Sequence, residues 1–253
     1  MKVLKRLRRD APPEAELPPA PDQPLLAVGD IHGRLDLLDR LLTRLDSPDG
    51  QWLTAFPLIF VGDYIDRGEQ SAQVLHRLYA LSQVRPGVTC LLGNHEQMML
   101  EFLAAPEEKG PRWVRYGGLQ TLASFGLGYI SENASAAQWR EIAERLTEAL
   151  GPELRRWLEG RPLIWTSGNV TVVHAAADPQ RPLDRQERQT LLWGHPDFEG
   201  TPREDGQWIV HGHTIVDQPQ ARAGRIAIDT GAYATGRLTV ALISPDEVLF
   251  EQS

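Results

Sequence analysis

Short apolar runs alternate with segments of helical periodicity through the first third of this chain. The runs lie at 25–28, 58–61 and 88–92, and each is followed by a segment in which apolar residues recur at helical spacing. The first such segment, 34–45, has Leu35, Leu38, Leu42 and Leu45 on one helical stripe. Strands that alternate with helices are typical of parallel pairing. This order therefore predicts a layered α/β fold.

The rest of the chain divides into a helical middle and a strand-rich end. Residues from about 104 to 160 are predicted to be mostly helical. Ser135 and Gln138 form a capping-box pattern that starts one helix, and Gly151-Pro152 is expected to end it. A second sheet, or a mixed one, must take the later strands, which are predicted at 169–173, 207–210, 225–228, 238–243 and 246–250.

Residues 1–24 differ from the rest of the chain because they are rich in proline and show no apolar periodicity. They are predicted to be a disordered extension, and residues 25–253 to be one domain. The first ten residues are basic although the whole chain has a net charge of −8. Such a tail is either a solvated extension or a contact for an acidic surface. The acidic body disfavours nucleic acid as a partner, since that affinity comes mostly from Lys and Arg.

Composition also limits where this protein is expected to work. No apolar run approaches the about 20 residues of a membrane-spanning helix. The single cysteine, Cys90, excludes a disulfide framework and a multi-cysteine zinc site. The basic start is followed by neither an apolar segment nor a cleavage-like site, so no secretory signal is expected. We therefore expect a cytoplasmic protein with no membrane span.

Polar side chains follow six of the predicted strands, at the point where each strand ends. They are Asp30 and His32 after 25–28, Asp63 and Asp66 after 58–61, Asn94 and His95 after 88–92, His174 after 169–173, His211 and His213 after 207–210, and Asp229 after 225–228. In open α/β sheets, ligands bind beyond the carboxyl ends of the strands. The six clusters therefore predict one composite site.

Carboxylate, amide and imidazole groups, without a thiolate, are the metal ligands that this site offers. They belong to Asp30, His32, Asp63, Asn94, His174 and His213. That mixture suits Mn²⁺, Fe or Zn²⁺ better than Ca²⁺. The ligands are too many for one tetrahedral ion and the right number for a pair. Two metals about 3.5–4 Å apart clamp the attacking and leaving oxygens of a phosphoryl displacement. His211 is expected to pack rather than to bind metal.

Three ordered motifs, GDIHG at 29–33, GDYIDRG at 62–68 and GNHE at 93–96, precede the isolated His174 and the Gly212-His213 pair. This series resembles the calcineurin-like metallophosphoesterases, and within them the bacterial and phage form of the PPP serine/threonine phosphatases. The segment from Trp113 to Gly126 resembles those bacterial enzymes too. The resemblance covers about 25–243 and implies a β-sandwich of two mixed sheets flanked by helices, with the metal site at the carboxyl ends of the strands.

The resemblance also implies a role for each metal ligand. Asp30 and His32 would bind the first metal, and Asn94, His174 and His213 would bind the second. Asp63 would bridge the two metals. The metals would be two divalent ions. Mn²⁺ is the expected ion, and Fe and Zn²⁺ are the alternatives. A hydroxide that bridges them would attack phosphorus directly.

Other residues receive catalytic and binding roles from the same resemblance. His95 would protonate the leaving oxygen, and Asp66 would orient its ring by a hydrogen bond. Arg67 would bind phosphate oxygens. Asp229 is expected to orient a ligand histidine. Tyr233 either lines the substrate mouth or lies on a surface loop.

Two positions depart from the family pattern. Ile215 stands where broader metallophosphoesterases have a second metal-binding histidine, which agrees with the PPP branch. His195 stands where the family commonly has a second phosphate-binding arginine after Trp193. His195 binds phosphate when protonated, or Arg185 or Arg188 replaces it, or phosphate binding is weaker at this position.

The leading functional hypothesis is a metal-dependent phosphatase that acts on phosphoserine or phosphothreonine in proteins. The alternatives in the same chemistry are a symmetrical dinucleoside-polyphosphate hydrolase and a small-molecule phosphatase. Asp66-Arg67 and Glu96 favour the protein phosphatase, because those hydrolases more often lack the acid–arginine pair and have GNHD. A non-catalytic binding module would have lost ligands or the acid, and all six ligands and His95 are present.

Overall fold

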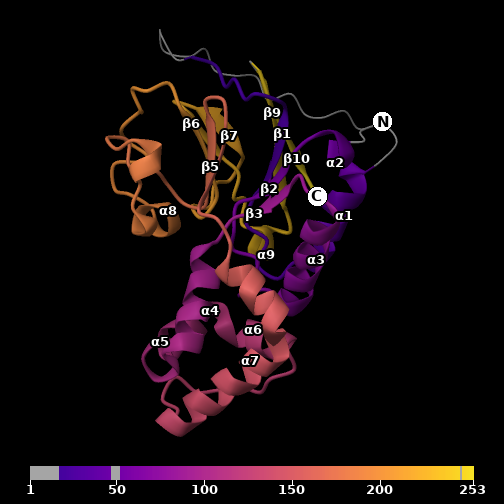
Figure 1. The fold of residues 1–253 in the computed structure, drawn as a ribbon, viewed down its shortest axis with the longest axis vertical. Helices are drawn as coiled ribbons and strands as arrows, with labels where there is room; N and C mark the ends of the chain where they lie inside the picture. Colours follow the sequence, from indigo (N-terminus) through magenta and orange to yellow (C-terminus); the bar gives the residue numbers. More distant parts are fainter. Residues whose placement is uncertain (1–16, 47–51, 246) are drawn as a thin grey trace.

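In the computed structural model, which describes residues 17–46, 52–245 and 247–253, two five-stranded sheets lie face to face (Figure 1). The first sheet has the order β10-β9-β1-β2-β3. Its members are β1 (Leu25–Val28), β2 (Leu58–Phe60), β3 (Val88–Cys90), β9 (Thr239–Ser244) and β10 (Glu247–Gln252). β1, β2 and β3 are parallel, whereas β9 is antiparallel to both of its neighbours, so the sheet is mixed.

The second sheet has the order β4-β5-β6-β8-β7. Its members are β4 (Ile164–Ser167), β5 (Val170–Val173), β6 (Trp208–His211), β7 (Gln220–Arg222) and β8 (Arg225–Ala227). β5, β6 and β8 are parallel, and the edge strands β4 and β7 are antiparallel to their neighbours. Each sheet therefore contains three parallel strands, and the residues at the carboxyl ends of these strands can form a site.

The alternation of side chains along β1 explains how the sheets pack. Leu25 and Ala27 are fully buried in the apolar cluster between the sheets, together with Val172 of β5. Leu26 and Val28 point to the opposite face of the sheet and join the cluster that includes the helices. A strand buried on both faces appears in the sequence as a continuous apolar run, as residues 25–28 do.

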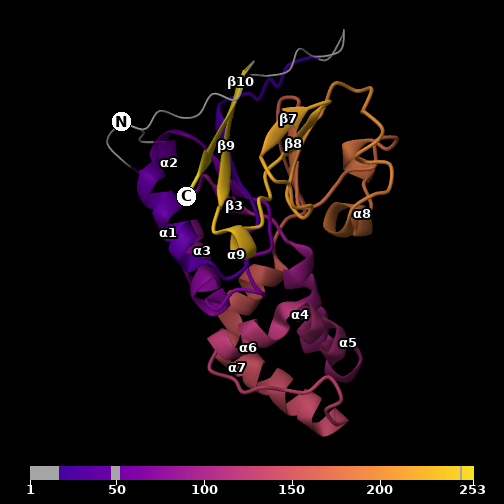
Figure 2. The same cartoon turned by 180° about the vertical axis from the view of Figure 1, so that it is seen from behind.

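Helices cover the outer face of the first sheet and continue into a helical half at one end of the sandwich (Figure 2). The longer helices are α1 (Leu35–Leu45), α3 (Ser71–Val84), α4 (Asn94–Ala104), α5 (Pro106–Trp113), α6 (Leu119–Ser124) and α7 (Ala136–Glu159). The short ones are α2 (Trp52–Ala55), α8 (Arg188–Trp193), α9 (Ala232–Thr235) and a 3₁₀ turn at Leu183–Arg185. A π-helical turn at Val114–Gly118 joins α5 to α6.

The predicted α/β architecture with two mixed sheets is confirmed. The predicted strand at 238–243 pairs with β1, so the first sheet takes two of the five later strands. β4 and β7 were not predicted because neither is a continuous apolar run. β4 ends in Thr166-Ser167 and its Trp165 is only half-buried, and β7 is Gln-Ala-Arg. The capping box at Ser135 and Gln138 is confirmed. Gly151 has the non-helical φ of 70° and ψ of 163°, so the helix that begins at Ala136 breaks there as predicted, and a second helical segment of α7 follows it to Glu159.

Residues 17–24, which the sequence assigned to the disordered extension, make hydrogen bonds to the second sheet and the loops beside it. The Ala20 amide donates to Oδ1 of Asn169 at 2.6 Å, and the Asp22 amide donates to Oγ of Ser167 at 2.9 Å. The carbonyl of Leu17 accepts from Nε1 of Trp208 at 2.8 Å. Residues 1–16 of the predicted extension lie outside the described residues.

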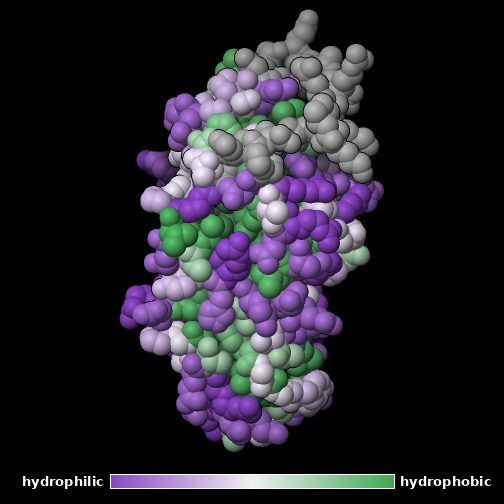
Figure 3. All heavy atoms as spheres, turned by 90° about the vertical axis from the view of Figure 1, so that its right-hand side faces the viewer, coloured by the Kyte–Doolittle hydropathy of each residue, from purple (hydrophilic) through white to green (hydrophobic). Residues whose placement is uncertain are grey.

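On one side of the molecule, hydrophilic residues separate smaller apolar patches (Figure 3). Within the described residues, no helix is both long and apolar enough to cross a membrane.

Candidate metal centre and active site

The loops that follow the parallel strands meet at one end of the sandwich, where it joins the helical half (Figure 1). The amide of Ile31 donates to the carbonyl of Asp63 at 3.0 Å, which connects the loops after β1 and β2. The amide of His95 donates to Oδ1 of Asp63 at 3.1 Å, and the amide of His213 donates to Asp30 across the two sheets. The predicted composite site is therefore formed by loops from both sheets.

The carboxylate of Asp63 lies between two histidines. Its Oδ2 is 3.5 Å from Nε2 of His32, and its Oδ1 is 3.4 Å from Nε2 of His174. Two groups of possible metal ligands share this carboxylate: His32, Asp63 and His95 form one, and Asp63, His174 and His213 the other. Asp63 therefore occupies the position that a bridge between two ions requires.

Both histidines beside Asp63 have a fixed tautomer. Nδ1–H of His32 donates to the carbonyl of Ile65 at 2.7 Å, and Nδ1–H of His174 donates to the carbonyl of Val61 at 3.1 Å. Each ring therefore presents an unprotonated Nε2 to the site. Burial lowers the pKa of His32 to about 3 and that of His174 to about 4, so both rings are neutral. Neutral imidazole is the form that binds metal.

Asn94, the first residue of α4, brings an amide oxygen into the same group. Its Oδ1 is 2.8 Å from Nε2 of His174 and 3.0 Å from Nδ1 of His213. Because the His174 tautomer leaves no hydrogen on Nε2, two acceptor atoms face each other there. A cation satisfies both lone pairs, so the donor set fits a metal ion.

Asp30 and Asp229 are both buried beside this centre. Both oxygens of Asp30 accept the amide of His213, at 3.2 and 3.1 Å. Burial and the nearby carboxylates of Asp229 and Asp63 raise the pKa of Asp30. Burial raises the pKa of Asp229 to about 6, and its Oδ1 accepts the amide of Gly231 at 2.8 Å. Within the described residues, the bond of Asp229 is thus to a backbone amide and not to a ligand histidine.

His95 and Asp66 form a buried pair. Nδ1–H of His95 donates to Oδ2 of Asp66 at 2.6 Å. The same carboxylate accepts Oγ1–H of Thr121 at 2.6 Å and Nε1–H of Trp113 at 3.0 and 3.2 Å. Burial opposes a charge on His95, but the carboxylates of Asp63 and Asp66 outweigh it and raise the His95 pKa. The ring is therefore suited to hold and release a proton.

Arg67 lies next to this pair at the edge of the site. Its Nη2 is 3.3 Å from Nε2 of His95, and its guanidinium carbon lies 4.7 Å from the ring centre of Tyr233. The Tyr233 ring in turn meets His32 edge to face at 5.4 Å between centres. Tyr233 therefore borders the site, on the side of Arg67 and His32. Planar guanidinium is well shaped for phosphate oxygens.

Left-handed backbone conformations are concentrated in these loops. Five of the six non-glycine residues with positive φ in the described part of the chain are His32, Asp63, Asp66, Arg67 and His213. Such conformations cost about 1–3 kcal/mol each and persist where the surroundings determine them. The glycines of the sequence motifs suggested tight turns at the glycines. The strained backbone conformations also occur at the functional residues themselves, which the sequence motifs did not indicate.

Glu96 is the residue whose role sequence reasoning missed. Its buried carboxylate accepts the amides of Asp63 at 2.9 Å, Tyr64 at 2.8 Å, Ile65 at 3.2 Å and Gly93 at 3.0 Å. It therefore holds the loop that carries Asp63. Part of the signal was available: a Glu at the third position of a helix can accept the amide of the residue before the helix, as Glu96 does from Gly93 at 3.0 Å.

His195 and Arg188 are two of the residues predicted as candidates for a second phosphate contact, and the structure places them against different neighbours. Nε2 of His195 lies 3.7 Å from a carboxylate oxygen of Asp178, and its Nδ1 accepts the amide of Asp197 at 3.3 Å. Arg188 reaches the α4 side instead, where its Nε donates to Oε1 of Gln97 at 3.0 Å. Gln97 lies in α4, the helix that also carries Asn94 and His95, so Arg188 contacts an element of the site.

Comparisons with known proteins agree with this geometry. The sequence profile of the family described as calcineurin-like phosphoesterase matches residues 23–217. The asymmetrical bis(5′-nucleosyl)-tetraphosphatase PrpE of Bacillus velezensis is 29% identical over 232 residues, 84% of this chain and 86% of that protein. Serine/threonine-protein phosphatase 2 of Salmonella typhimurium is 28% identical over 225 residues, 84% and 89% of the two chains. A solved serine/threonine phosphatase structure from Saccharomyces cerevisiae shares the fold, with a TM-score of 0.57 at 18% identity over 92% of this chain and 80% of that chain.

Proposed function

We propose that this chain, which belongs to the calcineurin-like phosphoesterase family, hydrolyses a phosphoanhydride bond of a dinucleoside tetraphosphate with the help of two divalent metal ions. The observation that carries the proposal is the Asp63 carboxylate between Nε2 of His32 and Nε2 of His174, at 3.5 and 3.4 Å. Two metal ions that share a carboxylate are suited to phosphoryl displacement.

The metal ligands in this proposal are those expected from the motifs. One ion would be held by Asp30, His32 and Asp63, and the other by Asp63, Asn94, His174 and His213. The structure brings His32 and Asp63 together in one group, which also includes His95, and Asp63, His174 and His213 in the other. When bound, such ions stabilise charge on the phosphoryl oxygens and lower the pKa of a bound water. The oxygen and imidazole donors favour Mn²⁺, with Fe and Zn²⁺ as the alternatives.

The general acid in this proposal is His95. Its Nδ1–H is held by Asp66, so Nε2 is the atom that carries the transferred proton. Arg67 binds the oxygens of the reacting phosphate, and its guanidinium is kept in place by the Tyr233 ring. The carboxylates of Asp63 and Asp66 raise the pKa of His95 against the effect of burial, which favours the protonated form that a general acid needs.

Phosphoserine or phosphothreonine in proteins is the second candidate substrate. It is supported by the relative from Salmonella typhimurium, which carries the name of a serine/threonine phosphatase. The dinucleoside tetraphosphate is preferred because the Bacillus velezensis relative carries that substrate in its name, with asymmetrical cleavage. For this chain we therefore propose asymmetrical rather than symmetrical cleavage, which yields a nucleoside triphosphate and a monophosphate.

Rates on diadenosine tetraphosphate, a phosphothreonine peptide and p-nitrophenyl phosphate, measured with added Mn²⁺, test the proposal. We expect the highest kcat/KM on the dinucleotide and ATP with AMP as products. Two ADP molecules would contradict asymmetrical cleavage, and a higher kcat/KM on the peptide would establish the second candidate. Chelation should abolish turnover of all three, and full activity of the chelated protein would overturn the metal-dependent chemistry.

A further inference from the structure

One arginine and two aromatic rings lie together outside the metal centre. This outer cluster consists of Arg112, Tyr116 and Trp193. The guanidinium carbon of Arg112 is 4.7 Å from the ring centre of Trp193 and 6.0 Å from that of Tyr116. Arg112 is exposed, and Tyr116 is 48% exposed although it is a large aromatic residue. Within the described part of the chain, Arg112 has no carboxylate at ion-pair distance, so its charge is not neutralised there.

The outer cluster is joined to the active site through its sequence neighbours. Trp113, which follows Arg112, donates Nε1–H to both carboxylate oxygens of Asp66 at 3.0 and 3.2 Å. Gly117, which follows Tyr116, accepts the amide of Arg67 at 3.4 Å. The turn at Val114–Gly118, in which Gly117 has the non-helical φ of 113°, connects these two contacts and brings Tyr116 to the surface.

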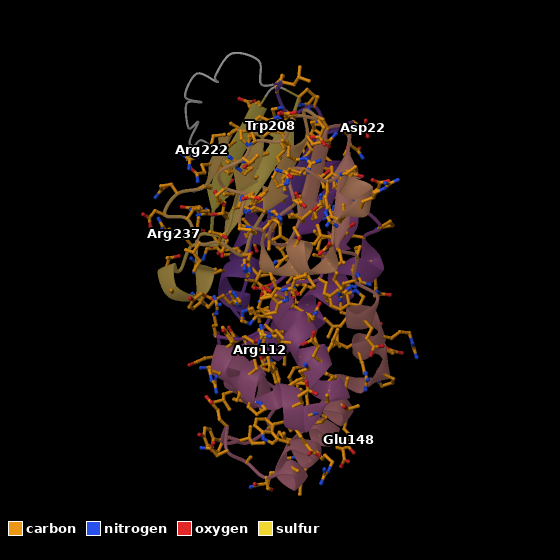
Figure 4. All side chains as sticks on the ribbon, turned by 90° about the vertical axis from the view of Figure 1, so that its left-hand side faces the viewer. Asp22, Arg112, Glu148, Trp208, Arg222 and Arg237 are labelled. Atoms are coloured by element: carbon orange, nitrogen blue, oxygen red, sulfur yellow. The ribbon has the colours of Figure 1, made fainter. Side chains whose placement is uncertain are left out.

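Trp193 reaches the outer cluster from the side of the second sheet. It is the last residue of α8, and the first residue of that helix, Arg188, donates to Gln97 of α4 at 3.0 Å. The cluster therefore lies between α8 and the helical half. In Figure 4, Arg112 is near the level at which the helical half meets the sheets. Residues from two distant parts of the chain thus form a surface that continues from the side of the site on which Arg67 lies.

The chemistry of the outer cluster matches a nucleotide. Guanidinium pairs with phosphate oxygens through parallel N–H groups, and an exposed aromatic ring stacks on a nucleobase. A phosphothreonine peptide offers one phosphate, which Arg67 at the edge of the site can bind. A dinucleoside tetraphosphate offers further phosphates and a base beyond the reacting phosphorus. An unneutralised arginine that lies against two rings is suited to that additional part of the substrate.

We propose that Arg112, Tyr116 and Trp193 bind the leaving nucleoside triphosphate of a dinucleoside tetraphosphate, an inference that rests on the proposed function. In the reaction, the oxygen of water bonds to the reacting phosphorus and the bridging P–O bond breaks. The electron pair of that bond goes to the leaving phosphate oxygen. One proton of the water passes to solvent, and the other stays on the new nucleoside monophosphate until that phosphate ionises. The leaving oxygen carries negative charge at neutral pH, and Arg112 stabilises that triphosphate.

Arg112→Ala and Tyr116→Ala test the outer cluster, with Arg115→Ala as the matched control. Arg115 is exposed like Arg112, but it pairs with Glu132 at 2.7 Å. Two quantities are measured for each variant: the Kd of the non-hydrolysable β,γ-methylene analogue of ATP by calorimetry with Mn²⁺, and kcat/KM on diadenosine tetraphosphate and p-nitrophenyl phosphate. Metal content is determined in parallel, so that loss of metal is recognised.

We expect Arg112→Ala to weaken analogue binding and lower kcat/KM on the dinucleotide by about 10- to 100-fold. Tyr116→Ala should weaken both by about 5-fold or more, because the stacked ring is lost. kcat/KM on p-nitrophenyl phosphate should stay within about twofold, since that substrate has no second phosphate. Arg115→Ala should match the parent in every measurement.

Equal Kd values for the Arg112→Ala and Arg115→Ala proteins would overturn the inference. An equal loss on both substrates would also overturn it, because Arg112 would then only hold α5 against α8. A parent that hydrolyses p-nitrophenyl phosphate but not the dinucleotide would contradict the proposed function alone. The calorimetric comparison would still decide whether the outer cluster binds nucleotide.

Discussion

Nδ1–H of His95 donates a 2.6 Å hydrogen bond to the Asp66 carboxylate, and neither residue is more than 1% exposed. Thr121 and Trp113 donate to the same carboxylate, so its orientation is fixed before substrate arrives. The ring of His95 is therefore held with Nε2 toward Asp63, at 3.8 Å from its Oδ2. In the proposed mechanism this arrangement gives adjacent residues separate roles: Asn94 would bind metal through its amide oxygen, and His95 would protonate the leaving group.

His95→Asn should reduce kcat on an alkyl phosphate by about 10²–10⁴-fold, because its leaving alkoxide needs a proton. The loss should be smaller on p-nitrophenyl phosphate and on diadenosine tetraphosphate, whose leaving groups are stable anions. Stopped assays on the three substrates, with metal content measured on the same samples, check this expectation. Equal losses on all three substrates would refute an acid role, and loss of bound metal would make His95 a ligand.

Asp63→Asn should remove more bound metal than any change of a single histidine, because both ligand groups share this carboxylate. We expect Mn²⁺ bound per chain to fall close to zero in Asp63→Asn and to about half of the parent value in His32→Ala. Metal analysis after equilibrium dialysis measures both. The parent should also gain about 2.7 kcal/mol of stability for each bound ion at Mn²⁺ concentrations of about 100 Kd.

Asp39→Asn is the control for that comparison, since Asp39 is exposed and pairs with Arg77 away from the centre. It should bind as much Mn²⁺ as the parent. An Asp63→Asn protein that keeps one ion firmly bound would show that the two ligand groups are independent, contrary to a bridging carboxylate.

The strands and the motif residues could be predicted because local patterns encode them. Residues 25–28 are apolar without interruption, since β1 is buried on both faces, and Asp30 and His32 follow directly at its carboxyl end. β4 could not be predicted in this way. It is an edge strand whose Thr166 is exposed, so its sequence lacks the apolar run of a buried strand. Its strand conformation is defined by pairing with β5.

The finer arrangement of the site depends on contacts between distant residues, which residue patterns do not contain. Glu96 holds the amides of Asp63, Tyr64 and Ile65 from 31 to 33 positions away. Similarly, the sequence left His195, Arg185 and Arg188 as alternatives for a second phosphate contact, and it did not indicate that His195 lies beside Asp178 and Asp197. The positive φ values of Asp66 and Arg67 follow from such tertiary contacts as well.

Gly117→Ala should lower activity through the position of Arg67. Gly117 has φ 113°, and a Cβ there would lie 2.7 Å from the amide nitrogen of Arg67. We expect about 1–3 kcal/mol of destabilisation from the backbone conformation, and about 10- to 100-fold lower kcat/KM from the displaced guanidinium. Thermal unfolding and kinetics on p-nitrophenyl phosphate measure the two effects.

Gly126→Ala is the matched control, because Gly126 has φ 74° but a Cβ there would meet nothing within 4 Å. It should be destabilised by a similar amount and keep the parent kcat/KM. If both variants lose activity in proportion to stability, the close approach of Gly117 to Arg67 has no catalytic consequence.

Cys90 should be inert to thiol reagents in the folded protein. It is fully buried in β3, and burial raises its pKa to about 12. At pH 8 the reactive thiolate is therefore about 10³-fold scarcer than for an ordinary thiol. Reaction with a disulfide reagent should proceed only after guanidinium chloride is added, when one thiol per chain is titrated. Rapid native labelling would mean that β3 opens to solvent.

Asn169→Ala should destabilise the protein without changing its chemistry. The Asn169 side chain accepts the Ala20 amide at 2.6 Å and donates to the carbonyls of Pro18 at 3.0 Å and Gly206 at 3.1 Å. Loss of these three bonds should cost about 1–3 kcal/mol in urea unfolding.

The contacts of Asn169 are far from the catalytic loops: Figure 4 shows Asp22 and Trp208 at the end of the sandwich opposite the helical half. kcat on p-nitrophenyl phosphate should therefore equal that of the parent. Asn133→Ala, in an exposed turn, should change neither quantity. A chain that begins at Asp22 lacks Pro18 and Ala20, so it should lose stability to a similar extent and remain active. A truncated chain as stable as the parent would mean that residues 17–21 contribute nothing to the free energy of unfolding, and a lower kcat would mean that they reach the active site.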